Sequence, residues 1–379
     1  MKLAVLPNLT KKNAREIALS VLREGKALGI QCVMCDSLKA DFIQGDFSFL
    51  PEQEALQSAD FVVSIGGDGT MIHDAKLAAP LHKPVLGINA GRLGFMAGLE
   101  PQEIFLLKNL VCNNFAIDRR MLLDVKLKKD GQICYRSQCI NDVALVRGEE
   151  LRLLECSAFC DGQPIARYMA DGMVVATPTG STAYSLSAGG PVVDPSLECL
   201  LLTPVCAHSL FSRPMLFRPD AKLSLCAEMR DGGSVYLSCD GETEKIPEDC
   251  TLEVTKSELY ADFIRMKNDT FMDRLQAKFF KRGPGLKRKR HALILELIQQ
   301  YEITTQDELL AKLRENGFEV TQRPYPAISK NCGLSRRCLP AGNTGIWPAR
   351  RRATNISQNS IRSSPAPSFL LIMRGTPVW

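Results

Sequence analysis

The segment Gly66–Thr70, with the sequence Gly-Gly-Asp-Gly-Thr, is the first candidate for chemistry. It follows the apolar run Phe61–Ile65 and precedes a stretch of helical character, Met71–Ala79. Free N–H groups at a helix N-terminus bind anions, and glycines let the backbone approach a phosphate. A carboxylate beside a phosphate is repelled unless it serves a proton, a hydroxyl or a metal. Asp68 is therefore the candidate catalytic residue, although a glycine turn after a strand often has only a structural role.

A second polar segment, Thr177–Ser187, follows the apolar run Met173–Ala176. Its hydroxyl groups and the N–H groups of an expected helix start suit a phosphate or a polar planar ligand. The alternative interpretation is a loop rich in Ser and Thr that caps a helix.

The elements that position the first motif alternate between strand and helix over residues 1–118. Helical spacing predicts a helix over Asn13–Leu28, and apolar runs predict four strands: Leu3–Leu6, Ile30–Met34, Phe61–Ile65 and Pro84–Ile88. This alternation predicts a parallel α/β domain with helices outside the sheet. Ligands bind at the carboxyl ends of such strands, where Gly66–Thr70 and Asn89–Met96 fall.

Residues 119–256 change to a period of two, which predicts an all-β domain resembling a sandwich. Its expected strands are Leu123–Lys128, a continuous strand over Ile133–Leu145, Val235–Cys239 and Leu252–Val254, with a hairpin turn at Asp161–Gly162. Residues 257–282 are expected to return to the α/β domain.

Composition indicates a cytoplasmic protein of two or three domains. The 379 residues include no apolar run of the ~18 residues that a membrane span needs, and the N-terminus has no signal-peptide pattern. The 14 cysteines are scattered, as is typical of a reducing compartment. No cluster has the spacing of a protein metal site, and the lone pair Cys32 and Cys35 fits a buried strand better than zinc.

Three segments together resemble the signature regions of the bacterial NAD kinase family: Gly66–Thr70, Asn141–Asp142 and Thr177–Pro191, in that order. Gly87–Phe95, Cys206–Leu210, Asp240–Glu242 and Phe263–Lys278 also resemble it, so the likeness covers about residues 1 to 280. The first motif alone is shared with lipid kinases. A diacylglycerol-type lipid kinase is therefore the alternative function.

The resemblance implies transfer of a phosphoryl group from ATP to the 2′-hydroxyl of the adenosine ribose of NAD, which gives NADP. It implies that the all-β domain of residues 119–256 binds the dinucleotide. It also implies a homo-oligomer with pockets completed across subunits, and Mg²⁺ carried mainly by ATP. Asp68 would be the catalytic base. The implied ATP-binding residues are Gly66, Gly67, Gly69 and Thr70, and the implied NAD-binding residues are Asp68, Gly69, His73, Phe95, Asn141, Asp142, Arg152, Asp171, Thr182, Ala183, Tyr184 and Ser187.

Some of these residues have structural alternatives. Asn141 and Asp142 could form a turn before a strand, and Arg152 could solvate a strand end. His73 and His208 could be hydrogen-bonded structural histidines.

Residues 283–322 resemble the first half of the winged helix-turn-helix of bacterial arginine repressors. A basic run, Lys287–Arg290, precedes two expected helices, His291–Tyr301 and Gln306–Asn316. In that family a recognition helix should begin after Gln322 and read the major groove. Here Pro324 and Pro326 oppose a helix. Sequence-specific DNA binding is therefore not expected, although the basic run could bind DNA weakly in a fusion of kinase and repressor.

Residues 323–379 have the character of an out-of-frame translation. If one G is missing after the codon of Gln322, one legal codon set for Gln322–Cys332 restores to Gln-Ala-Thr-Val-Ser-Arg-Asp-Ile-Lys-Glu-Leu, which resembles the repressor's recognition helix. The same shift turns Leu370–Val378 into a stretch containing Ser-Val-Asp-Tyr-Ala-Gly-Asn. From Pro324 onward there are eight basic residues and no acidic ones, whereas the preceding part has 39 basic and 42 acidic residues. We expect this tail to be disordered.

Overall fold

The computed structural model describes residues 1–42, 47–91, 94–149, 153–208, 212–229, 233–247 and 249–280. Beyond residue 280 it describes Leu297, Glu308, Lys312 and the backbone of two short strands. The chain divides into two compact units, residues 1–282 and 283–379. None of the described helices is long and apolar enough to cross a membrane.

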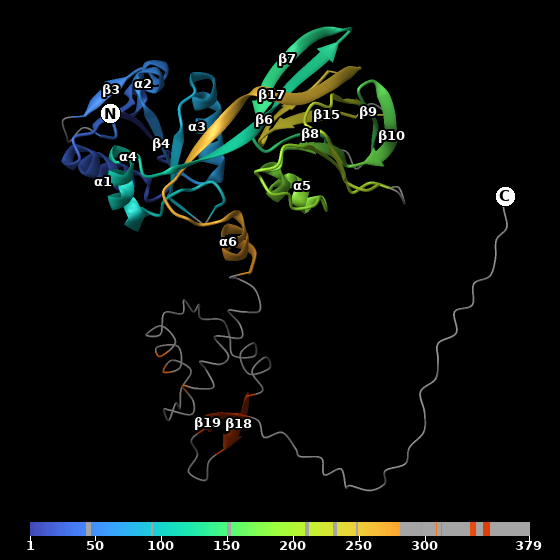
Figure 1. Cartoon of the computed structure of the whole chain (residues 1–379). Coiled ribbons are helices and arrows are strands. Elements are labelled where there is room, and N and C mark those ends of the chain that lie inside the picture. Colours follow the sequence, from blue (N-terminus) through green and yellow to red (C-terminus); the bar gives the residue numbers. More distant parts are fainter. Residues whose placement is uncertain are drawn as a thin grey trace, which may run out of the picture. The chain divides into compact units, whose positions relative to one another are not determined.

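The first part of the chain forms a parallel α/β domain. Its elements are β1 (Lys2–Pro7), α1 (Ala14–Ala27), β2 (Gln31–Cys35), β3 (Ser48–Leu50), α2 (Glu52–Ser58), β4 (Phe61–Gly66), α3 (Asp68–Ala78), β5 (Val85–Asn89) and α4 (Lys108–Val111). The strands lie in the order β5-β4-β1-β2-β3, all parallel. Helix α1 covers one face, and α2 and α3 cover the other (Figure 1). Because both faces are buried, these strands read as continuous apolar runs.

The second part is an antiparallel β-sandwich. Its elements are β6 (Ala116–Lys129), β7 (Gln132–Cys139), β8 (Asp142–Arg147), β9 (Leu154–Cys160), β10 (Gln163–Ala170), β11 (Gly172–Ala176), α5 (Tyr184–Ser187), β12 (Leu200–Val205), β13 (Met215–Phe217), β14 (Leu223–Glu228), β15 (Val235–Cys239), β16 (Glu242–Lys245) and β17 (Cys250–Arg265). One sheet has the order β13-β12-β11-β8-β15-β16, and the other contains β10, β9, β14, β17, β6 and β7. Alternate residues of both sheets form one apolar core. The predicted combination of an α/β and an all-β domain is confirmed.

Strand β17 joins the two domains. Its first half pairs with β14 and carries Leu252 and Val254 into the core of the sandwich, whereas Phe263 pairs with Val85 of β5 and lies in the core of the α/β domain. A register shift against β6 between Lys256 and Tyr260 separates the two halves. The strand is followed by α6 (Phe271–Leu275) and a π-helical turn (Gln276–Phe280). The two domains therefore share one 11-stranded sheet.

Two predicted boundaries are wrong. The helix predicted from Met71 begins at Asp68 and ends at Ala78, so the acidic residue belongs to the first helical turn. The single strand predicted over Ile133–Leu145 is two strands in different sheets, β7 and β8, separated by Ile140 and Asn141. The cause of this break is the buried carboxylate of Asp240, which takes backbone N–H groups out of the sheet.

The unit of residues 283–379 is described at few positions. Leu297, Glu308 and Lys312 are helical and fall within the two helices expected there. Strands β18 (Leu334–Cys338) and β19 (Thr344–Pro348) pair as an antiparallel hairpin. An isolated two-stranded hairpin of this kind is marginally stable in water, and the expectation that residues 323–379 are disordered stays a prediction. The other residues of the expected tail lie outside the described part.

Candidate active site

The carboxylate of Asp68 is held at the start of α3. Strand β4 ends at Gly66, Gly67 is the residue before the helix, and the N–H of Met71 donates to the carbonyl of Gly67 at 3.1 Å. The Asp68 carboxylate accepts hydrogen bonds from the N–H groups of Phe95 (3.1 Å) and Met96 (3.0 Å). A Cβ atom on Gly94 would lie 2.0 Å from Asp68 Oδ1. Only glycine at position 94 therefore leaves room for this arrangement.

Asp240 separates β7 from β8. Its carboxylate accepts hydrogen bonds from three consecutive backbone N–H groups, those of Ile140 (2.9 Å), Asn141 (2.8 Å) and Asp142 (3.1 Å). These groups point at one side chain, so they cannot join a sheet ladder. Asp240 itself lies in a tight turn at φ 50°, a conformation that Asp tolerates better than most residues.

The segment after β11 packs against this break. The N–H of Thr177 donates to the carbonyl of Asn141 at 2.9 Å, and its hydroxyl donates to the carbonyl of Ile140 at 2.6 Å. A Cβ on Gly180 would lie 2.0 Å from the carbonyl oxygen of Asn141. The two polar motifs, far apart in sequence, therefore form one surface.

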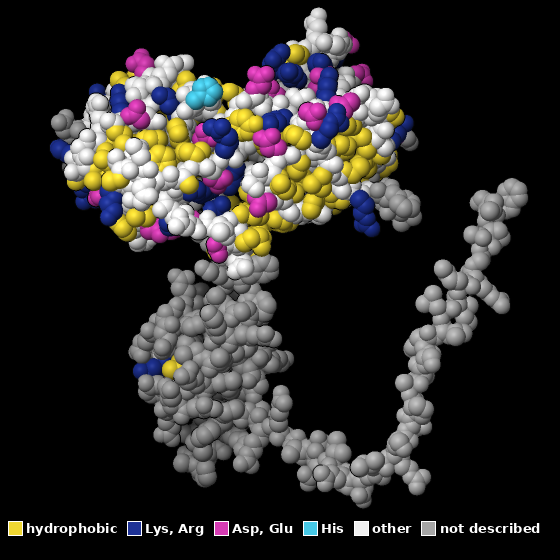
Figure 2. Space-filling view, viewed as in Figure 1, with side chains coloured by type: hydrophobic (Ala, Val, Ile, Leu, Met, Phe, Trp, Pro, Cys, Tyr) yellow, Lys and Arg dark blue, Asp and Glu magenta, His cyan; other side chains and the backbone are white. Residues whose placement is uncertain are grey.

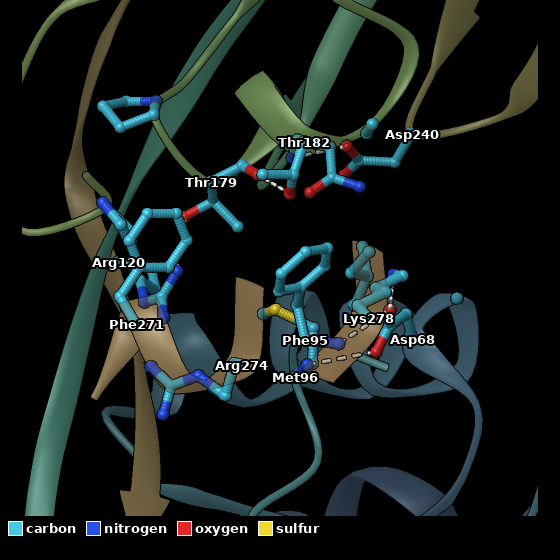
Figure 3. A pocket seen from close by; sticks show the side chains of 16 residues that line it. Asp68, Phe95, Met96, Arg120, Thr179, Thr182, Asp240, Phe271, Arg274 and Lys278 are labelled. Carbon is cyan, nitrogen blue, oxygen red and sulfur yellow. Dashed lines mark hydrogen bonds and ion pairs between the residues drawn. The ribbon is translucent and has the colours of Figure 1, made fainter. Parts of the chain in front are cut away.

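These parts line a cleft that opens to solvent and has a cavity volume of about 240 Å³. Asp68 and Phe95 lie on one side of it and Thr179, Thr182 and Asp240 on the other (Figure 3). The lining residues are Asp68, Gly69, Ile72, Phe95, Met96, Arg120, Asn141, Pro178, Thr179, Thr182, Ala183, Pro195, Asp240, Phe271, Arg274 and Lys278. The cleft is thus built by both domains and by the segment after β17.

Burial controls the charges behind the cleft. Burial, with the nearby Asp240 charge, raises the pKa of Asp142 to about 7, against a hydrogen bond from the backbone N–H of Tyr184 that lowers it. Burial also raises the pKa of Asp240, although three backbone N–H groups and Lys76 oppose this. Two buried carboxyl groups side by side repel each other when both are ionised.

The chain matches two families over this unit: the ATP-NAD kinase N-terminal domain at residues 5–114 and the ATP-NAD kinase C-terminal domain at residues 140–266. The NAD kinase of Caldanaerobacter subterraneus subsp. tengcongensis is 34% identical over 285 residues, which are 74% of this chain and 99% of that protein. The chain belongs to the NAD kinase family. Residues 286–324 match the DNA-binding domain of arginine repressors, as the sequence indicated.

Two solved structures have the same fold as this NAD kinase family member. Yeast NADH kinase in complex with NADH has a TM-score of 0.68 and 25% identity over 74% of this chain and 87% of that chain. The NAD kinase from Archaeoglobus fulgidus in complex with ATP has a TM-score of 0.55 and 26% identity over 74% of this chain and 97% of that chain.

The cleft brings together six of the residues that the family resemblance implied: Asp68, Gly69, Phe95, Asn141, Thr182 and Ala183. Asp142 and Tyr184 lie next to them, joined by the hydrogen bond from the Tyr184 N–H to the Asp142 carboxylate. Ser187 is exposed at the end of α5, and Arg152 lies outside the described residues.

Two implied residues line a second cavity, at the carboxyl ends of β1 and β2. It contains Thr70 and His73 and shares Gly69 with the cleft. The side-chain amide of Asn8 donates to the Thr70 hydroxyl at 2.8 Å. His73 Nδ1 lies 3.3 Å from Asp74 Oδ1, and this hydrogen bond raises the pKa of His73. His73 therefore lines this second cavity and not the cleft.

Gly66 packs closely against the side chain of Thr70. A Cβ on Gly66 would lie 2.5 Å from the Cβ of Thr70, whereas a Cβ on Gly67 or Gly69 would have no neighbouring atom within 4 Å. Gly67 and Gly69 therefore leave space for a ligand at the helix N-terminus, and the expected role of Gly66 in ATP binding stays a prediction.

Ten lining residues were not predicted as site residues, among them Arg120, Thr179, Asp240, Phe271, Arg274 and Lys278. The available signal for Asp240, Arg274 and Lys278 is that they belong to segments that carry the family likeness. Arg120 lies in a strand of period two, where a cation normally faces solvent. Instead it is 3% exposed, pairs with Asp118 at 2.6 Å and donates to the Thr179 hydroxyl at 3.1 Å.

Proposed function

We propose that this protein transfers the terminal phosphoryl group of ATP to the 2′-hydroxyl of the adenosine ribose of NAD, giving NADP. The observation that carries the proposal is the Asp68 carboxylate, which lines a cleft whose opposite side contains Thr179, Thr182 and Asp240 (Figure 3). Asn141 and Ala183 also line this cleft. A ribose bound against the side that contains Thr182 would face the Asp68 carboxylate. The relatives named NAD kinase support the same reaction.

In this mechanism Asp68 orients the 2′-hydroxyl and accepts its proton while the oxygen bonds to phosphorus and the phosphorus–oxygen bond to ADP breaks. The N–H groups at the start of α3, near Gly67, Gly69 and Thr70, would hold donor phosphates. Asn141 would hydrogen-bond the adenosine part, next to Asp142, and Phe95 would offer an apolar face.

Mg²⁺ fits this site as a companion of the nucleotide. The two carboxylates that line the cleft, Asp68 and Asp240, each already accept at least two backbone hydrogen bonds. No group of three or more His, Cys, Asp or Glu that could hold a metal occurs among the residues that the structure describes. The metal, when bound to ATP, would neutralise phosphate charge.

The test is NADP formation from NAD and ATP, measured with the full chain and with residues 1–282. Because the cleft lies entirely within the first unit, we expect the truncated protein to keep most of its activity. Diacylglycerol in place of NAD tests the lipid-kinase alternative. The reaction assignment fails if neither protein forms NADP.

Asp171 leads us to propose a homo-oligomer. It precedes β11 at the end opposite Ala176, which pairs with Asp142, so it lies roughly 16 Å along the strand from the cleft. Its side chain pairs with Arg147 at 2.6 Å. Hydrophobic side chains gather on the sandwich around α5 (Figure 2). The exposed large hydrophobic residues of this domain include Tyr184, Val192, Leu197 and Leu216. A partner subunit seated there could receive Asp171 in its own cleft.

Active-site complementation tests this arrangement. Asp68→Asn and Asp171→Asn variants are each expected to be weakly active, but subunits unfolded and refolded together should regain activity, because mixed oligomers contain one cleft with both carboxylates. Activity that stays at the level of the two separate variants would mean that Asp171 does not act across subunits.

We also propose that residues 323–379 are translated out of frame and that the protein does not bind DNA sequence-specifically. The match to the repressor domain stops at residue 324, next to the expected lesion after Gln322. Resequencing the DNA across this codon tests the frameshift, which is wrong if no related copy has an additional base there.

We also propose that the protein is cytoplasmic. The free thiols of the 12 cysteines whose side chains the structure describes support this location, because disulfides are rare in a reducing compartment.

A further inference from the structure

Lys278 is the one cation that contacts the Asp68 carboxylate among the described residues. Its Nζ lies 3.3 Å from Asp68 Oδ2 and 4.0 Å from the centroid of the Phe95 ring. Asp68 Oδ2 also accepts the Phe95 N–H, so Phe95 contacts both members of the ion pair. Both side chains are about 30% exposed, Lys278 at 31% and Asp68 at 28%, so a ligand in the cleft can reach them.

The other two cationic side chains that line the cleft form ion pairs with carboxylates other than Asp68. Arg120 pairs with Asp118 at 2.6 Å. Arg274 lies 3.1 Å from Asp269 and 3.7 Å from Asp118. Lys278, by contrast, has Asp68 as its carboxylate partner, and an ammonium group carries three donors, of which Asp68 takes one.

Packing fixes the segment that carries Lys278. Thr270 and Asp273 cap the start of α6 by reciprocal hydrogen bonds of 2.9 and 3.2 Å. The rings of Phe271 and Phe279 lie 6.5 and 5.7 Å from the ring of Phe95. The ammonium group is thus presented to the cleft from a segment anchored on both sides of Lys278.

The proposed reaction creates an electrostatic difficulty at this point. The carboxylate must be within hydrogen-bond reach of the 2′-hydroxyl, and the donor phosphate must be in line with the same oxygen. Two anionic groups are therefore neighbours when the reaction begins, and their repulsion opposes binding of the donor. A cation that touches both groups removes this repulsion and follows the negative charge as it develops on the transferred group.

We propose that Lys278 bridges Asp68 and the transferred phosphoryl group, with one N–H on the carboxylate and another on a phosphoryl oxygen. The proposal rests on the proposed function. Lys278 stays protonated throughout: the proton of the 2′-hydroxyl passes to Asp68, the new bond from oxygen to phosphorus forms, and ADP leaves with the electrons of the broken bond.

The test compares Lys278→Met, Lys278→Arg and Lys278→Ala in the full chain. We expect Lys278→Met to lower kcat/KM for ATP by about 10² to 10³-fold. The KM for NAD should stay within about twofold of the wild-type value, because the side of the cleft where we place the ribose is unchanged. Lys278→Arg should restore a large part of the rate, and ethylammonium added to Lys278→Ala should raise its rate in a saturable way. A purely structural role predicts neither rescue.

Lys267→Met is the matched control. Lys267 pairs with Glu103 at 2.8 Å, is 36% exposed and does not line the cleft, so its loss should leave kinetics unchanged. Wild-type rates in Lys278→Met, or equal losses of affinity for NAD and ATP without rescue, overturn the role of Lys278. A wild-type protein that forms no NADP overturns the proposed function instead, so the two failures are distinguishable.

Discussion

Replacement of Asp68 by asparagine is expected to lower kcat for NADP formation by about 10³-fold. The amide has nearly the same shape but cannot accept the proton of the 2′-hydroxyl at neutral pH. It also has one acceptor oxygen where the carboxylate has two, so it cannot serve the N–H groups of both Phe95 and Met96 as the carboxylate does. Steady-state kinetics with NAD and ATP measure the effect.

Asp262→Asn provides the control for this substitution. Asp262 makes a two-pronged ion pair with Arg119, at 2.8 and 2.9 Å, outside the cleft. Such a surface pair contributes about 0–1 kcal/mol to stability, so kinetics should not change. Equal rates for Asp68→Asn and the wild type would contradict the assignment of Asp68 as base.

Substitution of Gly94 by alanine is expected to lower kcat by about 10²-fold without removing any functional group. The added Cβ would lie 2.0 Å from Asp68 Oδ1 and 2.6 Å from its Cγ, so the carboxylate or the Phe95–Met96 backbone must move by roughly 1 Å to reach ordinary contact distances. Displacement of a catalytic group by about 1 Å costs a rate factor of that size. Kinetics of the purified variant, with circular dichroism to establish folding, provide the measurement.

Gly91→Ala is the matched control for Gly94→Ala. It adds the same methyl group in the same loop, but no atom of the described residues lies within 4 Å of the new Cβ. We expect wild-type kinetics from it. If Gly94→Ala is also fully active, the position of Asp68 seen here is not the one that the reaction uses.

Several features of this protein could be predicted from the sequence because their causes are local. The strands of the α/β domain are apolar along their whole length because both faces of the sheet are buried, and the sandwich strands alternate because one face is. The Gly66–Thr70 motif identified Asp68 because a strand, a glycine turn and a helix start follow one another within a few residues. The likeness to arginine repressors was also read from contiguous residues, and residues 286–324 match that family.

The tertiary structure alone decided which distant residues share the cleft. The break at Ile140–Asn141 depends on Asp240, about 100 positions away, whose carboxylate takes three backbone N–H groups out of the ladder. Lys278 reaches Asp68 across 210 positions because β17 crosses from the sandwich into the parallel sheet. The position of Asp171, which precedes β11 at the end far from the cleft, and the separate cavity of His73 have the same origin. Each of these positions depends on strand register and on the direction in which a side chain leaves its helix or strand. Long-range strand pairing sets both properties, so no local sequence pattern encodes these positions.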